Sequence, residues 1–151
     1  MSSPTRGVVY SNDAYSTDIA YLTITTLGNA ADFGDQSQGF GHHGQGIASN
    51  AVRGLFQGGY GTNAITAVTI PTFGSAFDFG DQTTTRYTAG AAASGTRYVT
   101  IAGQGFAPAA GMTNVMEYVQ IMTTGNTIDF GDLSRTGYYV SGMSNGHGGL
   151  G

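Results

Sequence analysis

The amino-acid sequence predicts an all-β protein that repeats one sheet module three times. Three observations predict it: glycine makes up 26 of 151 residues, the tetrapeptide DFGD occurs three times, and no window shows a sustained helical period. Glycine mixed with Thr, Val, Ile and Tyr is typical of short strands joined by tight turns. Because glycine does not recur at every third residue, a collagen-like chain is excluded.

The internal repeat has a period of about 40 to 50 residues, which indicates a repeat architecture. The DFGD copies begin at Asp32, Asp78 and Asp129. Apolar runs precede them at matching offsets, at 17–24, 63–70 and 114–121. A third family of related segments, each with an arginine near its start, covers 3–11, 49–59 and 94–105.

The middle copy shows the order of elements within one period. The runs AITAVTI (64–70), AFDFGDQ (76–82), YTAGAAAS (87–94) and TRYVTIAGQG (96–105) each read as a strand. Their spacing is typical of an antiparallel meander. In the first run Ile65 and Ala67 share one face, while Val68 and Ile70 share the other. Apolar residues on both faces predict a strand packed between two neighbouring sheets.

These elements resemble the repeats of kelch-like β-propellers. The likeness rests on RGLFQGG (53–59), a loop GYGTN, the strand AITAVTI, the hairpin PTFGS and an aromatic residue, Phe79, after it. It extends over about the whole chain and implies four-stranded blades, three per chain. The approximate repeats expected are 12–58, 59–105 and 106–151, with the N-terminal strand 3–11 completing a blade.

Three blades leave apolar flanks that need covering, because propellers typically have four to eight. We therefore expect a homodimer that closes a six-bladed ring, each N-terminal strand completing a blade of the partner. The alternative is that the chain is a fragment of a longer propeller. The end GHGGLG imperfectly duplicates the N-terminal strand, so which terminal strand closes the ring stays open.

The DFGD motif is interpreted as structural. A kinase-type metal site would need a lysine, and the chain has none. The phenylalanines are expected to point inward, and the glycines to take a backbone conformation that other residues resist, in a tight turn at the strand end. The aspartates are expected to accept hydrogen bonds from turn N–H groups, and one aspartate of each motif is expected to pair with an arginine. Calcium bound across the paired carboxylates is the alternative, but two carboxylates per loop supply fewer oxygen ligands than Ca²⁺ usually takes. The expected turn and ion-pair residues are Asp32, Asp35, Asp78, Asp81, Asp129, Asp132, Arg6, Arg53, Arg97 and Arg135.

Loops that differ between the copies are the candidates for ligand contact. Aromatic, histidine and arginine side chains in such loops suit stacking and hydrogen bonding to sugars. The candidates are Phe40, His42, His43, Tyr60, Arg86, Tyr87 and Phe106. The adjacent histidines could bind a transition metal, but no third ligand is identifiable, so neither metal nor cofactor is expected.

Composition narrows the function classes. A net charge of −4 with no basic cluster argues against nucleic-acid binding, and no apolar run is long enough to span a membrane. No nucleophile elbow, zinc-protease motif or P-loop is present, so catalysis is not expected. The chain contains no cysteine, which excludes disulfides.

The GNxxDFGD pattern resembles repeats common in tail and fibre proteins of tailed bacteriophages, marine ones especially. That likeness implies a virion-associated binding protein that recognises a glycan or a cell-surface receptor. The alternative is a purely structural, self-assembling virion component without a small ligand. No signal peptide is recognisable, so the expected location is the virion or extracellular space, and otherwise the cytoplasm.

Overall fold

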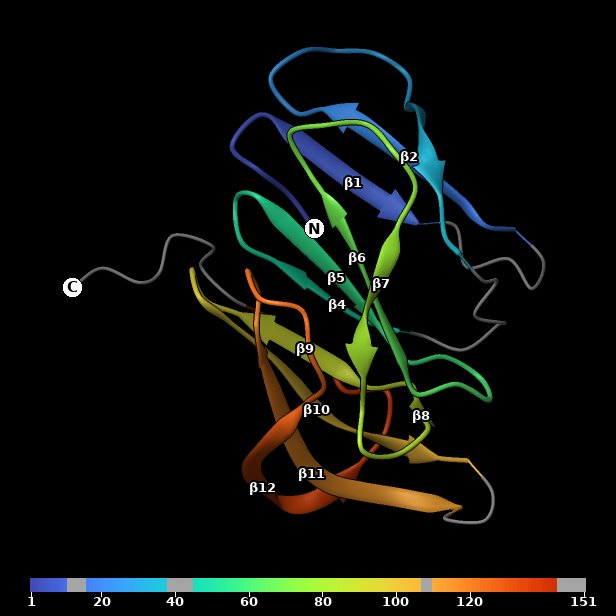
Figure 1. Cartoon of the computed structure of the whole chain (residues 1–151), viewed down its shortest axis with the longest axis vertical. Helices are drawn as coiled ribbons and strands as arrows, with labels where there is room; N and C mark the ends of the chain where they lie inside the picture. The colour runs from blue at the N-terminus through green and yellow to red at the C-terminus, as the bar shows by residue number, and fades with distance from the viewer. Residues whose placement is uncertain (11–15, 38–44, 107–109, 144–151) are drawn as a thin grey trace.

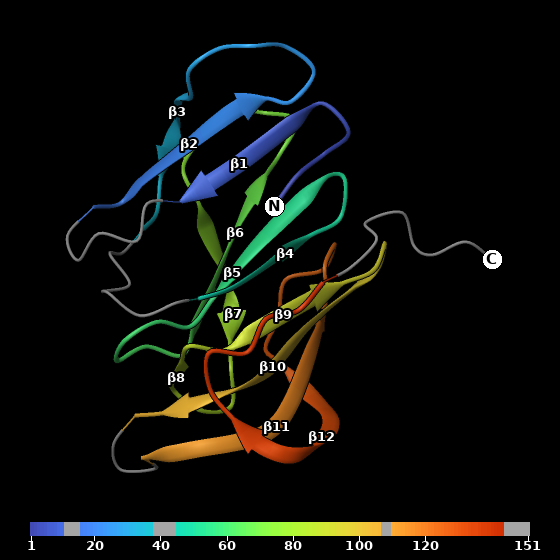
Figure 2. The ribbon, with the colours of Figure 1, turned by 180° about the vertical axis from the view of Figure 1, so that it is seen from behind.

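The computed structural model of the chain describes residues 1–10, 16–37, 45–106 and 110–143. These residues form twelve β-strands in three antiparallel sheets and no helix, which confirms the all-β prediction. No described segment is therefore an apolar helix of membrane-spanning length. The sheets follow one another along the molecule, with the second between the first and third (Figure 1; Figure 2 gives the reverse view).

Sheets 1 and 2 are meanders of strands consecutive in the chain, and in sheet 3 the strands from β9 onward follow the same order. Sheet 1 contains β1 (Arg6–Tyr10), β2 (Asp18–Thr23) and β3 (Ala31–Asp35). Sheet 2 contains β4 (Gly46–Ser49), β5 (Arg53–Gln57), β6 (Ala64–Thr69) and β7 (Phe77–Asp81). Sheet 3 contains β8 (Arg86–Tyr87), β9 (Gly90–Ala93), β10 (Arg97–Gly105), β11 (Gly111–Gln120) and β12 (Ile128–Gly137), with β8 and β9 both paired to the same edge of β10.

The sheets divide the chain at other points than the expected repeats. The expected boundary between 58 and 59 falls between β5 and β6, yet these strands pair with each other from Arg53↔Thr69 to Gln57↔Ile65. The N-terminal strand β1 pairs with β2 of its own chain. In each sheet, the strand with the arginine (β1, β5 or β10) comes before the strand of the apolar run (β2, β6 or β11) and pairs with it. The expected repeats place the arginine strand after the apolar run.

Sheet 2 is buried on both faces, as the apolar residues on both faces of its central strand predict. On one face Phe56, Val68 and Ile70 pack with Val8, Ile19 and Phe33 of sheet 1. On the other face Leu55, Ile65, Ala67 and Phe79 pack with residues of sheet 3, including Tyr98, Val119 and Ile121. Two apolar cores, one on each side of sheet 2, therefore hold the three sheets together.

The DFGD motif forms the last four residues of β3 and β7 and lies near the start of β12, so it is extended strand and the expected tight turn is wrong. The register shifts by one residue opposite each motif, which is a β-bulge. In sheet 2, for example, Ile65 pairs with Gly80 and Thr66 with Asp78. The bulge glycines have positive φ, and Asp32 and Asp129 each accept a hydrogen bond from the N–H two residues on, at 3.1 and 3.2 Å.

The bulges of sheets 1 and 2 each hydrogen-bond to a turn of the next sheet. Gly74 donates to the Phe33 carbonyl at 3.0 Å, and Ala76 donates to the Asp35 carbonyl at 2.7 Å. Sheets 2 and 3 repeat this contact, with Gly125 donating to Phe79 at 2.8 Å and Thr127 donating to Asp81 at 2.9 Å. We call this pair of backbone bonds the bulge–turn contact. It places the motif glycine against backbone of the neighbouring sheet.

This close approach predicts a large cost for Gly80→Ala. A Cβ there would lie 2.3 Å from the Gly125 carbonyl oxygen, so the two sheets must separate. We expect a loss of about 2–3 kcal/mol in the free energy of unfolding, measured by urea denaturation. Gly61→Ala is the matched control, because Gly61 also has positive φ but its added Cβ would meet nothing within 4 Å. Its expected cost is about 1 kcal/mol, and equal costs at both positions would contradict the proposed contact.

Candidate binding surface and the polar network beneath it

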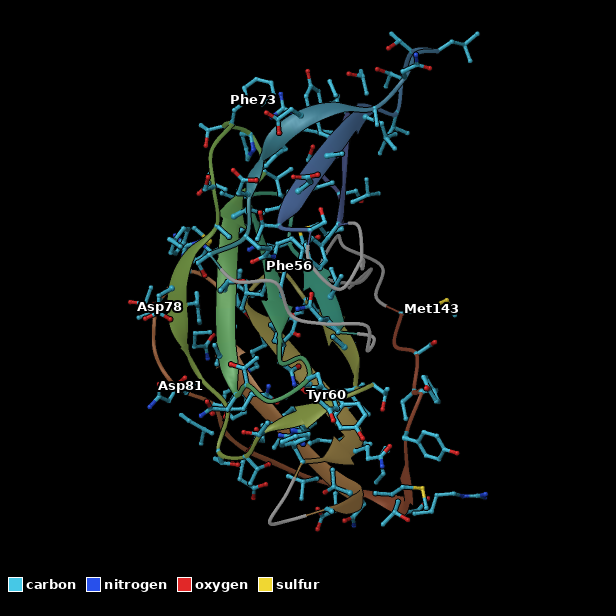
Figure 3. The ribbon with its side chains drawn as sticks, turned by 90° about the vertical axis from the view of Figure 1, so that its right-hand side faces the viewer. Phe56, Tyr60, Phe73, Asp78, Asp81 and Met143 are labelled. Carbon is cyan, nitrogen blue, oxygen red and sulfur yellow. The ribbon has the colours of Figure 1, made fainter. Side chains whose placement is uncertain are left out.

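Three of the expected ligand-contact residues lie together. The ring centroids of Tyr60 and Phe106 are 4.7 Å apart, and those of Tyr60 and Tyr87 are 5.6 Å apart. Tyr60 is 52% exposed, while Tyr87 and Phe106 are half-buried. We call this group the aromatic cluster. Tyr60 lies on the surface at the loop end of sheet 2, as the side view shows (Figure 3).

Backbone hydrogen bonds join the three segments that carry the aromatic cluster. The loop between β5 and β6 is tied to β8 by Gly59, whose N–H donates to the Arg86 carbonyl at 3.4 Å. Phe106 donates to the Thr85 carbonyl at 3.2 Å. Gly58 permits this packing, because its φ is +66° and a Cβ would lie 2.4 Å from the Arg86 oxygen. The rings are thus presented by loops fixed to the ends of strands, which limits the entropy lost on binding.

Arg86 does not belong to the exposed surface. Its side chain is 1% exposed, so the expectation that it contacts a ligand there is wrong. Its guanidinium pairs with the Glu117 carboxylate and donates to Gln82 Oε1 at 2.9 Å and to the Val115 carbonyl at 3.0 Å. These bonds satisfy a charge that would otherwise be costly to bury, and they anchor β8 beneath Tyr87.

A buried polar network extends from this ion pair between sheets 2 and 3. Gln57 donates to Gln82, and the Tyr98 hydroxyl lies 2.9 Å from both Gln57 Oε1 and the Gly46 carbonyl oxygen. Thr83 and Thr127 donate to Glu117. Burial raises the pKa of the Tyr98 hydroxyl well above its ordinary value, and the positive charge of Arg86 opposes that shift only in part.

Sequence reasoning missed this network, although one signal for it exists. Glu117 is the only glutamate in the chain, and it occupies the position of Ala20 and Thr66 in the other two copies. A charged residue at an inward-facing strand position predicts a buried partner. The glutamines at 57 and 82 carry no such signal, because glutamine is a residue type that is mostly exposed.

The expected pairing of DFGD aspartates with arginines is wrong. Among the described residues the single ion pair is that of Arg86 with Glu117. Arg6 and Arg53 instead donate to the carbonyls of Ile70 and Ile121, at 2.6 and 3.0 Å. The motif aspartates are exposed, and Asp78 and Asp81 point away from the body of the protein (Figure 3). A solvated carboxylate gains little from an ion pair, whereas a buried strand-end carbonyl needs a donor.

The inward orientation expected of the motif phenylalanines holds for two of the three. Phe33 and Phe79 are each 2% exposed, but Phe130 is 47% exposed because no further sheet covers it in the described part of the chain. Arg135 is exposed on β12.

The remaining expected contact residues, Phe40, His42 and His43, lie outside the described residues. Within the described ranges, no group of three or more His, Asp or Glu side chains is arranged to hold a metal ion.

Comparison with known proteins adds no family assignment. Neither a scan against models of protein families nor a search of curated proteins finds a significant match to this chain.

The Arg86–Glu117 pair predicts a strong effect of Glu117→Gln. The substitution leaves the buried guanidinium without a counter-ion, so the free energy of unfolding should fall by about 3–5 kcal/mol. Asp78→Asn is the control, because that carboxylate is exposed and makes no ion pair with any described residue. Its expected effect is below about 0.5 kcal/mol. A Glu117→Gln loss as small as that of the control would show that the pair is not buried in solution.

The raised pKa of Tyr98 predicts a stability that falls in alkaline solution. The unfolded chain releases this proton near pH ~10, while the folded chain retains it to higher pH. The contribution is therefore complete below pH ~10 and is lost as the pH rises beyond it. Tyr98→Phe should flatten this fall when unfolding by urea is compared between about pH 8 and 11. An unchanged pH dependence in the variant would contradict the assignment.

Proposed function

We propose that the protein is a non-enzymatic binding module that recognises a glycan through the aromatic cluster of Tyr60, Tyr87 and Phe106. The observation that carries the proposal is the convergence of these three rings from separate segments, with Tyr60 half exposed. Ring faces stack on the apolar faces of sugars, and tyrosine hydroxyls hydrogen-bond to sugar hydroxyls. Loops fixed to strand ends suit such recognition, because little ordering is needed on binding.

The charge of the chain favours an uncharged glycan, free or on a receptor, over a glycan that carries many negative charges. The net charge is −4 and lysine is absent. The one arginine next to the cluster, Arg86, is paired internally with Glu117. A phosphate or sulfate group would therefore meet no available cation among the described residues of the cluster.

The setting we propose is the surface of a bacteriophage particle or the extracellular space. It rests on the resemblance of the GNxxDFGD repeats to those of phage tail and fibre proteins. A tail-associated module with an exposed aromatic surface would attach the particle to sugars of the host cell.

The second candidate is a purely structural virion component. The uncovered apolar residues of the outer sheets favour it, since Ile24 and Phe130 are half exposed although their counterparts in the other copies are buried. Such a component would assemble with copies of itself and bind no small ligand.

A glycan array tests the first proposal and separates it from the second. We expect reproducible binding that Tyr60→Ala weakens at least tenfold, which corresponds to a loss of about 1.4 kcal/mol in binding free energy. Tyr139→Ala is the matched control, because Tyr139 is 70% exposed but lies outside the cluster. Equal binding by both variants, or no binding to any glycan, would contradict the proposal. Silence on the array together with co-purification in particles would favour the structural role.

A further inference from the structure

Each sheet has a front face towards the sheet before it and a back face towards the sheet after it. The front of sheet 2 packs on the back of sheet 1, and the front of sheet 3 packs on the back of sheet 2. In the described part of one chain, the front of sheet 1 and the back of sheet 3 therefore have no sheet against them (Figures 1 and 2).

The back-to-front interface occurs twice with the same parts. The bulge–turn contact joins Phe33 and Asp35 to the turn at Gly74, and joins Phe79 and Asp81 to the turn at Gly125. The residue after each turn glycine accepts a hydrogen bond from the N–H of the last aspartate of DFGD. Ser75 accepts from Asp35 at 3.2 Å, and Asn126 accepts from Asp81 at 3.0 Å. Arg6 of sheet 1 and Arg53 of sheet 2 each donate to an isoleucine carbonyl of the next sheet. The contacts shared by these two interfaces define a template: they show which groups a third interface of the same kind would need on each of its two faces.

The uncovered back of sheet 3 carries every group that this template requires on its back side. Phe130, Gly131 and Asp132 repeat the bulge, and a Cβ on Gly131 would meet nothing within 4 Å. The counterparts Gly34 and Gly80 are in contact with backbone of the following sheet. Arg97 is exposed and stacks on Tyr118 at 4.9 Å, as Arg6 stacks on Tyr21 at 5.1 Å.

A hollow marks the same place. Its volume is about 390 Å³, and its lining includes Arg97, Val99 and Phe130. Val99 corresponds to Val8 and Leu55, which lie in the two cores where sheets meet. The back of sheet 3 thus has both the polar groups and the apolar surface of a face that packs against another sheet.

The uncovered front of sheet 1 carries the complementary groups. The turn Gly28–Asn29–Ala30 matches Gly125–Asn126–Thr127 in the repeat. Ile24 is 52% exposed, whereas its counterparts Ile70 and Ile121 are fully buried. Leu27 is fully exposed, and its counterpart Phe73 packs its ring on Tyr21 at 4.9 Å.

We propose that the back of sheet 3 binds the front of sheet 1 of a second copy of this chain, head to tail. Gly28 and Ala30 of one copy donate to the carbonyls of Phe130 and Asp132 of the other, and Asn29 accepts the Asp132 N–H. Arg97 donates to the Ile24 carbonyl, and Leu27 covers the rings of Tyr118 and Phe130. The geometry is read from the two internal interfaces, so no new kind of contact is needed.

In a dimer of this kind, the front of sheet 1 and the back of sheet 3 of each chain are both covered by the other chain. The two identical contacts are then related by a twofold axis, and the assembly contains six sheets around that axis. Six lies within the four to eight sheets that close such rings, whereas nine, from three copies, lies outside. The proposal does not depend on the glycan site, because the aromatic cluster belongs to neither face.

Light scattering on the intact chain tests the stoichiometry. We expect twice the mass of the 15.5 kDa chain at micromolar concentration. Ile24→Lys should weaken association at least tenfold, because it places a charge where the template has a fully buried isoleucine. Leu27→Lys is a second variant whose native side chain is fully exposed, so it leaves folding of the single chain intact. Val52→Lys is the control, since Val52 is 43% exposed and lies between β4 and β5 of sheet 2, which contributes to neither face.

Mixing two variants tests the head-to-tail geometry. Ile24→Lys blocks the front of sheet 1, and Phe130→Lys blocks the back of sheet 3, so each alone should be a monomer. An equimolar mixture retains one intact front and one intact back, and it should form heterodimers. A monomeric wild-type chain, a dimer that Ile24→Lys and Leu27→Lys leave intact, or a mixture that stays monomeric would each overturn the proposal.

Discussion

The structure depends on hydrogen bonds between the backbone of a bulged strand and the turn of the following sheet. A sheet packed on a sheet usually relies on side chains, with about 10 Å between the two. Here glycine at the third position of DFGD removes the Cβ and lets Gly34 and Gly80 approach neighbouring backbone directly. Both glycines take positive φ at a bulge, a conformation that other residues rarely adopt, so motif and contact occur together in β3 and β7.

The apolar cores and the arginines follow from that contact. Once the bulge sets the distance between sheets, residues such as Phe33 and Phe79 fill the space beside it. Arg6 and Arg53 reach across to carbonyls at the end of the next sheet's central strand. At the position of Glu117, sheet 2 has Thr66, which donates to Gln36 at 2.7 Å between sheets 1 and 2, whereas Glu117 pairs with Arg86 between sheets 2 and 3. This difference gives sheet 3 a different edge, with β8 and the aromatic cluster above it.

The repeat pattern predicts the strands well, because a strand is a short segment of chain whose side chains point alternately to the two faces of the sheet. Ile65 and Ala67 face one core and Val68 and Ile70 face the other, as the pattern indicates. The pattern does not predict the sheet boundaries, because a period has no marked beginning and β5 could join the strand before or after it. Long-range contacts are also missed: the partners of the arginines are backbone carbonyls about 65 residues away, which no residue type reveals. The convergence of Tyr60, Tyr87 and Phe106 likewise depends on how β8 pairs with β10.

Amide hydrogen exchange measured by NMR tests the bulge–turn contact most directly. Gly74 is solvent-exposed as a residue, yet its N–H donates to Phe33 across the sheet boundary. The account predicts slow exchange at Gly74, Ala76, Gly125 and Thr127, at rates close to those of the central strands. Exchange at these four amides as fast as in an open surface turn would contradict it, because the sheets would then be held by side chains alone.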